Sequence, residues 1–434
     1  MTTQPSSTGR DLQVSISERS RWGGNQPISF LMQQGVENPD CISLAAGLVD
    51  PATLPVELVR KTVTELLSDE VSARQALQYG TTAGSDTLRR ELLSHLADLE
   101  QTSVSELGIS ADQLVVTTGS QQFLSLVGEV LLNPGDITLV AAPTYFVYLG
   151  TLNGLGTRII PVATDEDGMR MDALEETLFQ LDSVGELSRV KMIYVVDYFD
   201  NPSAVSLSLE RRSQLVDIAR RWSREQRIAI LEDAAYRELR YDGPELPSIW
   251  SFDHDKQHVI LAMTFSKSFS PGLRVGYGVL PADLVGPVCD RKGNEDFGSA
   301  HFNQRLLARV LSSGEYTRHV EGLRSAYRLK RDCMLAAAER DFSQLPGVHW
   351  VSPRGGLYVW MTLPETVRTD FTSPLFSYAT KEEGVMYVPG DFCFAGPPTS
   401  RPRNHMRLSF GVQDCSGIEA GMQRLARAVA AQLP

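Results

Sequence analysis

Side chains that could do chemistry follow the ends of four apolar, strand-like runs in this sequence. They are Ser120 after residues 113–119, Asn201 after 190–196, Asp233 at the end of 227–233, and Lys267 after 258–266. In open α/β sheets, ligands bind outside the carboxyl ends of the strands, so we expect these side chains to share one edge of one sheet. The set combines a helix N-terminus suited to phosphate with an amide, an acid and a lysine.

The stretch "TFSKSFSPGLR", residues 264–274, extends this set. Thr264, Ser266 and Arg274 are of the types that bind phosphate. Lys267 stands among small hydroxyls, unlike a solvated surface lysine. A lysine at the end of a buried strand loses its charge by desolvation and can then act as a nucleophile. The stretch therefore predicts a nucleophilic lysine beside a phosphate-binding cup.

The elements that must position these groups alternate between strand and helix from about residue 60 to 280. Further strand-like runs are 137–143, 157–163 and 274–280, and amphipathic stretches such as 208–226 lie between the strands. Short, nearly continuous apolar strands alternating with amphipathic helices indicate a buried, mostly parallel sheet flanked by helices. We therefore expect an α/β fold for the larger part of the chain.

After about residue 303 the pattern changes. A long helical region at 303–341 precedes two strands, "GGLYVWMTL" and "HMRLSF", and a terminal helix. This order predicts a second, smaller α+β domain. We expect four parts: an N-terminal arm at 1–27, a segment at 28–60 that joins the small domain and the substrate site, a large ligand-binding domain at 61–303 and a small C-terminal domain at 304–434.

Composition limits the partners and the compartment. The chain has 434 residues and a formal net charge of −12, which argues against nucleic acid or an anionic membrane as the main partner. Its five cysteines are scattered without a CxxC pair and its seven histidines show no ligand spacing, so we expect no metal. The start lacks the apolar core of a signal peptide, and no run is long enough for a membrane helix. These features predict a cytoplasmic protein in a reducing compartment.

The combined features suit pyridoxal phosphate, which needs a Schiff-base lysine, an acid at its ring nitrogen and a phosphate cup. The sequence resembles the fold-type I aminotransferases of class I/II, and most of all the branch of aminoadipate and kynurenine aminotransferases. The resemblance extends from "ISLAAGLVDP" to "MRLSFG", residues 42–411. Its most specific motif is "SKSFSPGLRVGY", supported by its order relative to "GSQQ" and "LEDAAY".

The resemblance implies a role for each residue of the set. Lys267 would form the Schiff base and carry a proton between substrate and cofactor, and Asp233 would keep the ring nitrogen protonated. Asn201 and Tyr236 would hydrogen-bond the phenolic oxygen of the cofactor, and Tyr145 would stack on its ring. The phosphate would be held by Ser120, the Gln121 backbone, Thr264, Ser266 and Arg274.

Other residues would complete the site. Arg407 would bind the substrate α-carboxylate in a bidentate fashion, with Asn201 beside it and Gly47 lining the substrate site. Tyr79 in "LQYG" would reach the phosphate of the neighbouring subunit, so the resemblance implies a homodimer. The implied reaction moves an amino group from an amino acid to a 2-oxo acid by a ping-pong mechanism through Lys267.

The residues themselves leave alternatives open. Asp233 could be a helix N-cap, Tyr145 a packing residue, and Arg407 the partner of an internal acid. The same cofactor residues serve lyases and decarboxylases, although Arg407 favours retention of the carboxylate. A transcription regulator with an aminotransferase-like domain would carry an N-terminal winged-helix domain, and we expect none because "SLAAGLVDP" begins at residue 43.

The loop "DYFDNPSAVSLS" departs from the pattern of the family, which usually reads Asn-Pro-Thr-Gly there. Ser203 and Ala204 replace the last two residues. If that position requires a positive φ, alanine is disfavoured, so we expect an adjusted backbone with Asn201 still pointing inward. Asp197 and Asp200 are additional acids, which are either solvated or, in a sharper hypothesis, face a cationic group of the substrate.

The amino donor stays open at this point. In the resembling branch the N-terminal segment closes over the substrate, so residues 17–35 are expected to influence specificity. Arg19 and Arg21 either meet an acidic substrate side chain or are solvated. His405, two residues before Arg407, either faces the pocket or packs. Aromatic, aliphatic and aminoadipate-like donors all remain candidates.

Overall fold

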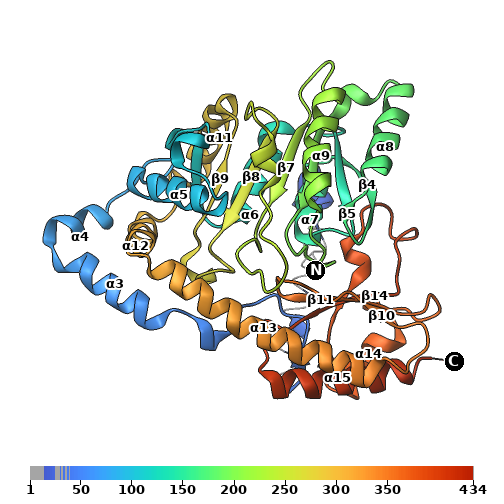
Figure 1. Ribbon diagram of the computed structural model, residues 1–434. Helices are drawn as coiled ribbons and strands as arrows, with labels where there is room; N and C mark the ends of the chain where they lie inside the picture. The colour runs from blue at the N-terminus through green and yellow to red at the C-terminus, as the bar shows by residue number, and fades with distance from the viewer. Residues whose placement is uncertain (1–13, 25–29, 31–32, 35–36, 39, 434) are drawn as a thin grey trace, which may run out of the picture.

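A large mixed sheet forms the centre of the protein in the computed structural model, which describes residues 14–24, 30, 33–34, 37–38 and 40–433 (Figure 1). Its eight strands are, in spatial order, β2 (Leu114–Thr117), β9 (Gly276–Val279), β8 (Val259–Thr264), β7 (Ala229–Asp233), β6 (Val190–Val196), β3 (Ile137–Ala142), β4 (Arg158–Asp165) and β5 (Gly168–Met169). The pairings from β8 through β7, β6 and β3 to β4 are parallel, and β9 runs antiparallel to both of its neighbours. The prediction of a largely parallel sheet is confirmed.

Helices cover both faces of this sheet because its central strands are buried on both sides. Every residue of β8 is buried, as is every residue of β6 except Lys191. One face packs against α6 (Ser120–Leu131), α7 (Phe146–Gly154) and α11 (Ala282–Asp296). The other face packs against α5 (Asp86–Leu99), α8 (Met171–Ser183), α9 (Leu209–Trp222), α10 (Ile249–Phe252) and α12 (His301–Ser312).

A smaller antiparallel sheet follows in the C-terminal part of the chain. It consists of β10 (His349–Trp350), β11 (Tyr358–Thr362), β14 (His405–Ser409) and β13 (Val388–Pro389). Helices α13 (Glu315–Phe342) and α15 (Cys415–Ala430) lie side by side next to it, with α14 (Pro374–Lys381) against α15 (Figure 1). The helical region expected at 303–341 consists of α12 and α13, separated at Gly314 with a φ of 71°. A smaller α+β unit is therefore present as predicted.

The N-terminal segment contacts both parts of the chain. Strand β1 (Ile42–Ser43) pairs in parallel with β12 (Val385–Met386), beside the small sheet. Helix α1 (Glu18–Trp22) lies against α7, and its Arg19 forms an ion pair with Glu129 of α6. Helices α3 (Val56–Ser68) and α4 (Glu70–Ala76) project from the side of the molecule (Figure 1). Most of the arm predicted at 1–27 lies outside the described residues.

Two further features concern the covalent structure and the environment of the chain. Cys333 in α13 and Cys415 in α15 form a disulfide across 82 residues of sequence, a pairing that the scattered cysteines did not predict. Cys41, Cys289 and Cys393 are free thiols. Among the described residues, no helix is both long enough and apolar enough to cross a membrane.

Two glycines give a matched test of the packing between β9 and α6. A Cβ on Gly278 would lie 1.8 Å from the Phe123 ring, whereas a Cβ on Gly322, inside α13, would meet nothing within 4 Å. We expect Gly278→Ala to lower the free energy of unfolding by about 1–3 kcal/mol through overpacking. Gly322→Ala should raise it by about 0.5–1 kcal/mol because alanine favours the helix. Denaturant unfolding measures both changes, and a neutral Gly278→Ala would show that Phe123 has room to move.

Candidate active site

The polar groups predicted from the sequence converge at the carboxyl edge of the large sheet. Asp233 ends β7, Lys267 follows β8, and Ser120 is the first residue of α6, directly after β2. Their electrostatic effects on Tyr145 show that these groups lie close together. Burial is the largest cause of the raised pKa of Tyr145, and the charge of Asp233 raises this pKa further. Arg274 and Arg407 lower it. Strands far apart in sequence thus deliver one cluster of acids, bases and aromatic rings.

Lys267 has the properties of a lysine that can act as a nucleophile. Its Nζ donates a hydrogen bond to the carbonyl oxygen of Gly47 at 2.7 Å, and no acid pairs with it among the described residues. Burial lowers the pKa of Lys267, and the positive charges of Arg407 and Arg274 lower it further. The neutral amine is therefore more accessible here than in a solvated lysine.

Asp233 is a buried acid with one free oxygen. Its Oδ2 accepts a hydrogen bond from the Tyr194 hydroxyl at 2.9 Å, while its Oδ1 has no hydrogen-bond partner in the structure. Burial raises the pKa of Asp233 to about 6. A buried carboxylate oxygen without a partner is unfavourable, and a cationic N–H of a ligand would satisfy it. This orphaned oxygen fits the ring nitrogen of pyridoxal phosphate. The N-cap alternative is wrong, because residues 235–238 form a turn and not a helix.

A compact cup for an anion lies beside Lys267. Thr264 Oγ1 is 3.0 Å from Ser266 Oγ, and Ser266 Oγ is 3.5 Å from Arg274 Nη1. A Cβ on Gly276 would lie 2.6 Å from the Ser120 backbone nitrogen, so only glycine lets β9 approach the start of α6 this closely. The backbone N–H groups in the first turn of α6 have no helical acceptor and together with these hydroxyls can bind phosphate.

Gln121 also belongs to the first turn of α6. Its side-chain Nε2 donates to Thr151 Oγ1 at 3.3 Å, so the side chain is directed toward α7. The backbone N–H of Gln121 is therefore the group that remains for a ligand at the helix N-terminus. This agrees with the role that the resemblance implies for the Gln121 backbone.

Asn201 and two tyrosines form a hydrogen-bonded group next to the cup. Asn201 Nδ2 lies 3.5 Å from the Tyr236 hydroxyl, and the hydroxyls of Tyr236 and Tyr358 are 3.1 Å apart. Burial alone would raise the pKa of Tyr358, but the charges of Arg407 and Lys267 hold it below its usual value. Tyr358 was not predicted from the sequence. The signal was its place in β11, which pairs with β14, the strand of Arg407.

Arg407 is a buried cation without an acidic partner. Its Nη1 donates to Asn201 Oδ1 at 2.8 Å, its Nη2 donates to the carbonyl oxygen of Ala45 at 2.9 Å, and its Nε has no partner. The internal acid considered as an alternative is absent, since no carboxylate of the described residues pairs with Arg407. Gly47 lies alongside, because a Cβ there would come within 2.7 Å of the Tyr358 hydroxyl. The arginine is thus available for an anionic ligand.

Tyr145 and Tyr79 occupy very different positions. Tyr145 immediately precedes α7, is partly buried, and is electrostatically coupled to Asp233 and Arg407. Tyr79 follows α4 and is 85% exposed. A side chain this exposed does not reach the buried cluster of its own chain. Its predicted contact with a neighbouring subunit is therefore the only route by which Tyr79 could join the site.

The two additional acids of the loop, Asp197 and Asp200, are buried, whereas solvated acids were one of the two expectations. Asp197 is fully buried and ion-paired with Arg212, and Asp200 is 6% exposed and accepts a hydrogen bond from Ser203 Oγ at 2.7 Å. Neither is a solvated acid, and Asp197 already has a cationic partner inside the protein, so the hypothesis of a substrate cation at Asp197 is wrong. Burial raises the pKa of Asp200 to about 7.

The backbone of the same loop also corrects an expectation. Ala204 has a φ of 63°, in the left-handed region. The chain therefore keeps a positive φ at this position rather than adjusting it, at a cost of about 1–2 kcal/mol for a residue with a Cβ. Asn201 still points toward Arg407, as expected.

Two residues considered for substrate contact have other partners. The His405 ring stacks on Trp360 with centroids 5.3 Å apart, and its Nδ1 lies 3.0 Å from Thr362 Oγ1, so the packing alternative holds. Burial lowers the pKa of His405 to about 4, which keeps the ring neutral. Arg19 pairs with Glu129 instead of facing the cluster.

Comparison with known proteins agrees with this geometry. Residues 39–425 match the family model described as aminotransferase class I and II. The chain belongs to this aminotransferase family. It is 35% identical to aromatic-amino-acid aminotransferase 1 of Thermococcus litoralis, over 91% of this chain and 89% of that protein. It is 32% identical to 2-aminoadipate transaminase of Thermus thermophilus, over 91% of each chain.

A solved structure extends the comparison to the fold. The kynurenine aminotransferase of Pyrococcus horikoshii, determined with PMP and kynurenine, superposes with a TM-score of 0.86 at 34% identity, over 96% of this chain and 98% of that one. The fold of this aminotransferase is therefore fold type I, and its relatives include the aminoadipate and kynurenine branch. Family membership makes the protein a transaminase, and members of this family depend on pyridoxal phosphate.

The state of Asp233 gives a pH-dependent prediction for the aminotransferase without cofactor. Its pKa is raised from 3.8 to about 6, so the folded state binds the proton more tightly than the unfolded state. Stability therefore falls as the pH rises through this window and stays reduced above it. We expect Asp233→Asn to stabilise the cofactor-free protein by about 2–3 kcal/mol at pH 7.5, and by little at pH 4, as measured by denaturant unfolding.

The same substitution should have the opposite effect on function. Loss of the charge at Oδ1 is expected to lower kcat by roughly 10²–10³-fold, the usual effect of removing one preorganised electrostatic group. Asp283→Asn, which changes an exposed acid paired with Arg227, is the control and should leave both stability and kcat nearly unchanged. If Asp233→Asn lowers both the free energy of unfolding and kcat, the proposed trade-off between stability and activity at Asp233 is wrong.

Proposed function

We propose that this aminotransferase binds pyridoxal phosphate at Lys267 and that Lys267, Asp233 and Arg407 carry the amino transfer. The observation that supports this most is the cluster itself: a lysine of lowered pKa beside a buried acid and a buried arginine that both lack full partners. When bound, pyridoxal phosphate supplies an aldehyde and an electron-withdrawing ring. The protein residues supply binding, orientation and proton transfer.

Each residue has a defined task in this proposal. Lys267 Nζ holds the cofactor and then, as a neutral amine, takes the proton from the substrate Cα and returns it during the exchange of the amino group. Asp233 Oδ1, ionised above about pH 6, accepts the N–H of the ring and keeps that nitrogen protonated. Asn201 and Tyr236 orient the phenolic oxygen, and Tyr145 covers the ring.

The phosphate group is proposed to lie in the cup at the start of α6. The groups that would bind the phosphate all offer a hydrogen-bond donor at the same end of the sheet. They are Ser120, the Gln121 backbone N–H, Thr264, Ser266 and Arg274.

The substrate α-carboxylate is proposed to bind Arg407, with Asn201 beside it and Gly47 leaving space. Arg407 has no carboxylate among the described residues, and its guanidinium lies 4.2 Å from the Tyr358 ring centre. A substrate carboxylate held in this way is retained in the product, which favours amino transfer over decarboxylation. A lyase reaction on the same cofactor remains an outcome that product analysis distinguishes.

A homodimer is the assembly that we propose. Large apolar or aromatic side chains are exposed along α3, α4 and the segment after them: Leu67, Val71, Leu77 and Tyr79. Such a row on projecting helices is typical of a surface covered by a partner. In the dimer Tyr79 would reach the phosphate in the neighbouring site.

The location and division of the chain are also proposals. Net charge and the three free cysteines support a cytoplasmic enzyme, while the Cys333–Cys415 disulfide weighs against a strongly reducing environment. The boundary near residue 303 falls in the first turn of α12, after the last strand of the large sheet and before the first strand of the small one. We keep the division at 61–303 and 304–434.

Cofactor attachment is tested by replacing each of two partly buried lysines with alanine in separate variants. Lys267→Ala should lose the visible absorption band of bound pyridoxal phosphate and its fixation by borohydride. Lys256→Ala is the matched control, because burial also lowers the pKa of Lys256 but its Nζ lies over the Trp250 ring, away from the cluster. A panel of aromatic, aliphatic and acidic amino acids mixed with wild-type protein should convert the band to that of the amine form and yield 2-oxo acids. Wild type without the band would refute the proposal, and ammonia or carbon dioxide as product would indicate a lyase or decarboxylase.

The contribution of Tyr79 is tested by hybrid dimers. Tyr79→Phe should weaken cofactor binding about 10–100-fold through loss of a hydrogen bond to a charged group. When Tyr79→Phe and Lys267→Ala chains are co-expressed, the mixed dimer contains one site with both changes and one intact site. Activity should therefore recover in the mixed dimer. No recovery would mean that Tyr79 acts within its own chain.

A further inference from the structure

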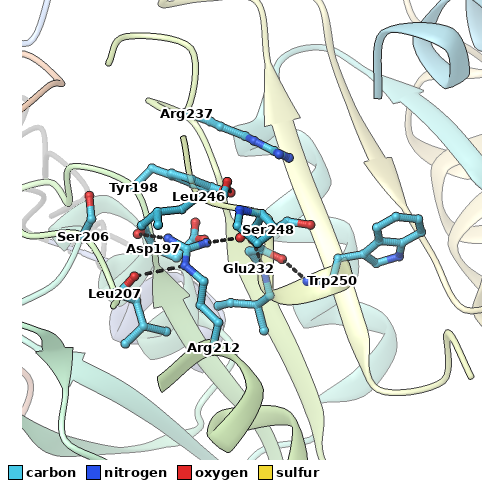
Figure 2. A network of polar contacts seen from close by, with 12 residues as sticks. Asp197, Tyr198, Ser206, Leu207, Arg212, Glu232, Arg237, Leu246, Ser248 and Trp250 are labelled. Atoms are coloured by element: carbon cyan, nitrogen blue, oxygen red, sulfur yellow. Dashed lines mark hydrogen bonds and ion pairs between the residues drawn. The ribbon is translucent and has the colours of Figure 1, made fainter. Parts of the chain in front are cut away.

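A buried arginine fastens the two ends of the loop that carries Asn201. Arg212, in α9, donates from Nη2 to the carbonyl oxygen of Asp197 at 2.9 Å and from Nε to the carbonyl oxygen of Leu207 at 3.0 Å. Its Nη1 pairs with the Asp197 carboxylate, and both side chains are completely buried (Figure 2). The Leu207 N–H also donates to the Asp197 carbonyl oxygen at 3.0 Å. Residues 197 and 207 are thus held as the closed base of one loop.

Glu232 links this base to the strand that carries Asp233. Its two oxygens accept the backbone N–H groups of Ile249 and Trp250 at 2.9 and 2.8 Å (Figure 2). Glu232 also hydrogen-bonds Asp197 through its side chain. In the register of β6 and β7, Val195 faces Glu232 and Val196 faces Asp233. The network therefore lies next to the carboxyl ends of β6 and β7, where the loop of Asn201 begins and where Asp233 ends its strand.

The charges of this network are balanced. Burial raises the pKa of Glu232 well above its usual value, and the neighbouring Asp197 raises it further, which favours the protonated form of Glu232. Asp197 then accepts from Glu232 and is paired with Arg212. The ring of Tyr198 lies between two guanidiniums, 4.3 Å from Arg212 and 5.3 Å from Arg237. Arg237 in turn pairs with Glu100.

The loop needs such support because part of its backbone is unfavourable. Phe199 and Ala204 have φ values of 48° and 63°, and each costs about 1–2 kcal/mol without glycine. The loop would relax unless its ends were fixed. Asn201 lies between these two residues, and its Oδ1 holds Arg407. A shift of the loop would therefore move the groups proposed for the cofactor and for the substrate carboxylate together.

We propose that Asp197, Arg212 and Glu232 form a positioning network that holds Asn201, and through it Arg407, in the geometry required for substrate and cofactor. This rests on the proposed function, because it assigns the network a task at that same site. None of the three contacts the reacting atoms, so they are positioning residues. Asp197 serves this task in place of the substrate contact considered from the sequence.

Two substitutions and a matched control separate positioning from general stability. Asp197→Asn leaves the buried Arg212 without its counter-charge, and Arg212→Lys keeps the charge but cannot bridge both carbonyl oxygens. Asp253→Asn is the control: Asp253 is equally buried, pairs with Arg220, and accepts from the backbone N–H groups at the opposite end of β8. Glu232→Gln keeps a donor toward Asp197 but can accept only one of the backbone N–H groups of Ile249 and Trp250, so it should lower Tm.

The expected results differ between the variants. On the holoenzyme, Asp197→Asn and Arg212→Lys should raise KM for the amino donor about tenfold or more, raise the dissociation constant of pyridoxal phosphate, and speed hydrogen–deuterium exchange across residues 197–207. Asp253→Asn should lower Tm without changing these three quantities. Arg212→Lys provides the answer if Asp197→Asn does not fold.

The opposite result would overturn the proposal. If Asp197→Asn and Arg212→Lys lower Tm but leave KM, cofactor affinity and loop exchange as in Asp253→Asn, the network has only a structural role. Failure of the proposed function looks different, because wild-type protein would then neither bind pyridoxal phosphate nor transfer an amino group, whatever the exchange of the loop.

Discussion

Buried charge without an internal counter-charge is the constraint on which this protein depends. Asp233 Oδ1 and Arg407 Nε are both buried and lack partners, and Lys267 donates only to a carbonyl oxygen. Such groups are costly in a folded protein unless something else satisfies them. Because the free acid, the free arginine and the lysine lie in one cluster, a single ligand assembly with a cation, an anion and an electrophile can satisfy them all. The stability that these unsatisfied groups cost the protein is recovered as binding free energy when a ligand satisfies them.

The contrast between two neighbouring acids shows how the fold separates function from support. Asp197 and Asp233 end up close together at the ends of adjacent strands, and both are buried. Asp197 is ion-paired with the buried Arg212 guanidinium and lies beside Glu232. Asp233 accepts a hydrogen bond from the Tyr194 hydroxyl, and no cationic side chain of the described residues pairs with it. The acid without a cationic partner is therefore the one suited to bind a cationic group of a ligand.

Local signals in the sequence were sufficient for the scaffold. The apolar runs became strands of the large sheet, and all residues of β7 and β8 are buried. Lys267 and Asp233 were found because they stand at the ends of these two runs. Contacts between distant segments were beyond those signals. Tyr358 enters the site through the pairing of β11 with β14, and Asp197 meets Arg212 only after α9 packs on the sheet. Loop acids look solvated in a sequence, because burial of a charge is decided by a partner elsewhere in the chain.

The residues of the Asn201 loop that depart from the family pattern are connected to one another by hydrogen bonds. Ala204 keeps a left-handed backbone that glycine would adopt more easily. Its N–H donates to the Asp200 carbonyl oxygen at 2.7 Å, and the Asp200 carboxylate accepts from the Ser203 hydroxyl. The extra acid and the serine thus close the turn in which the alanine stands, while Asp197 and Arg212 close the base of the loop. The hydrogen bonds added by Asp200 and Asp197 offset the conformational cost of Ala204 and Phe199, which explains how Asn201 keeps its direction toward Arg407 although its neighbours have changed.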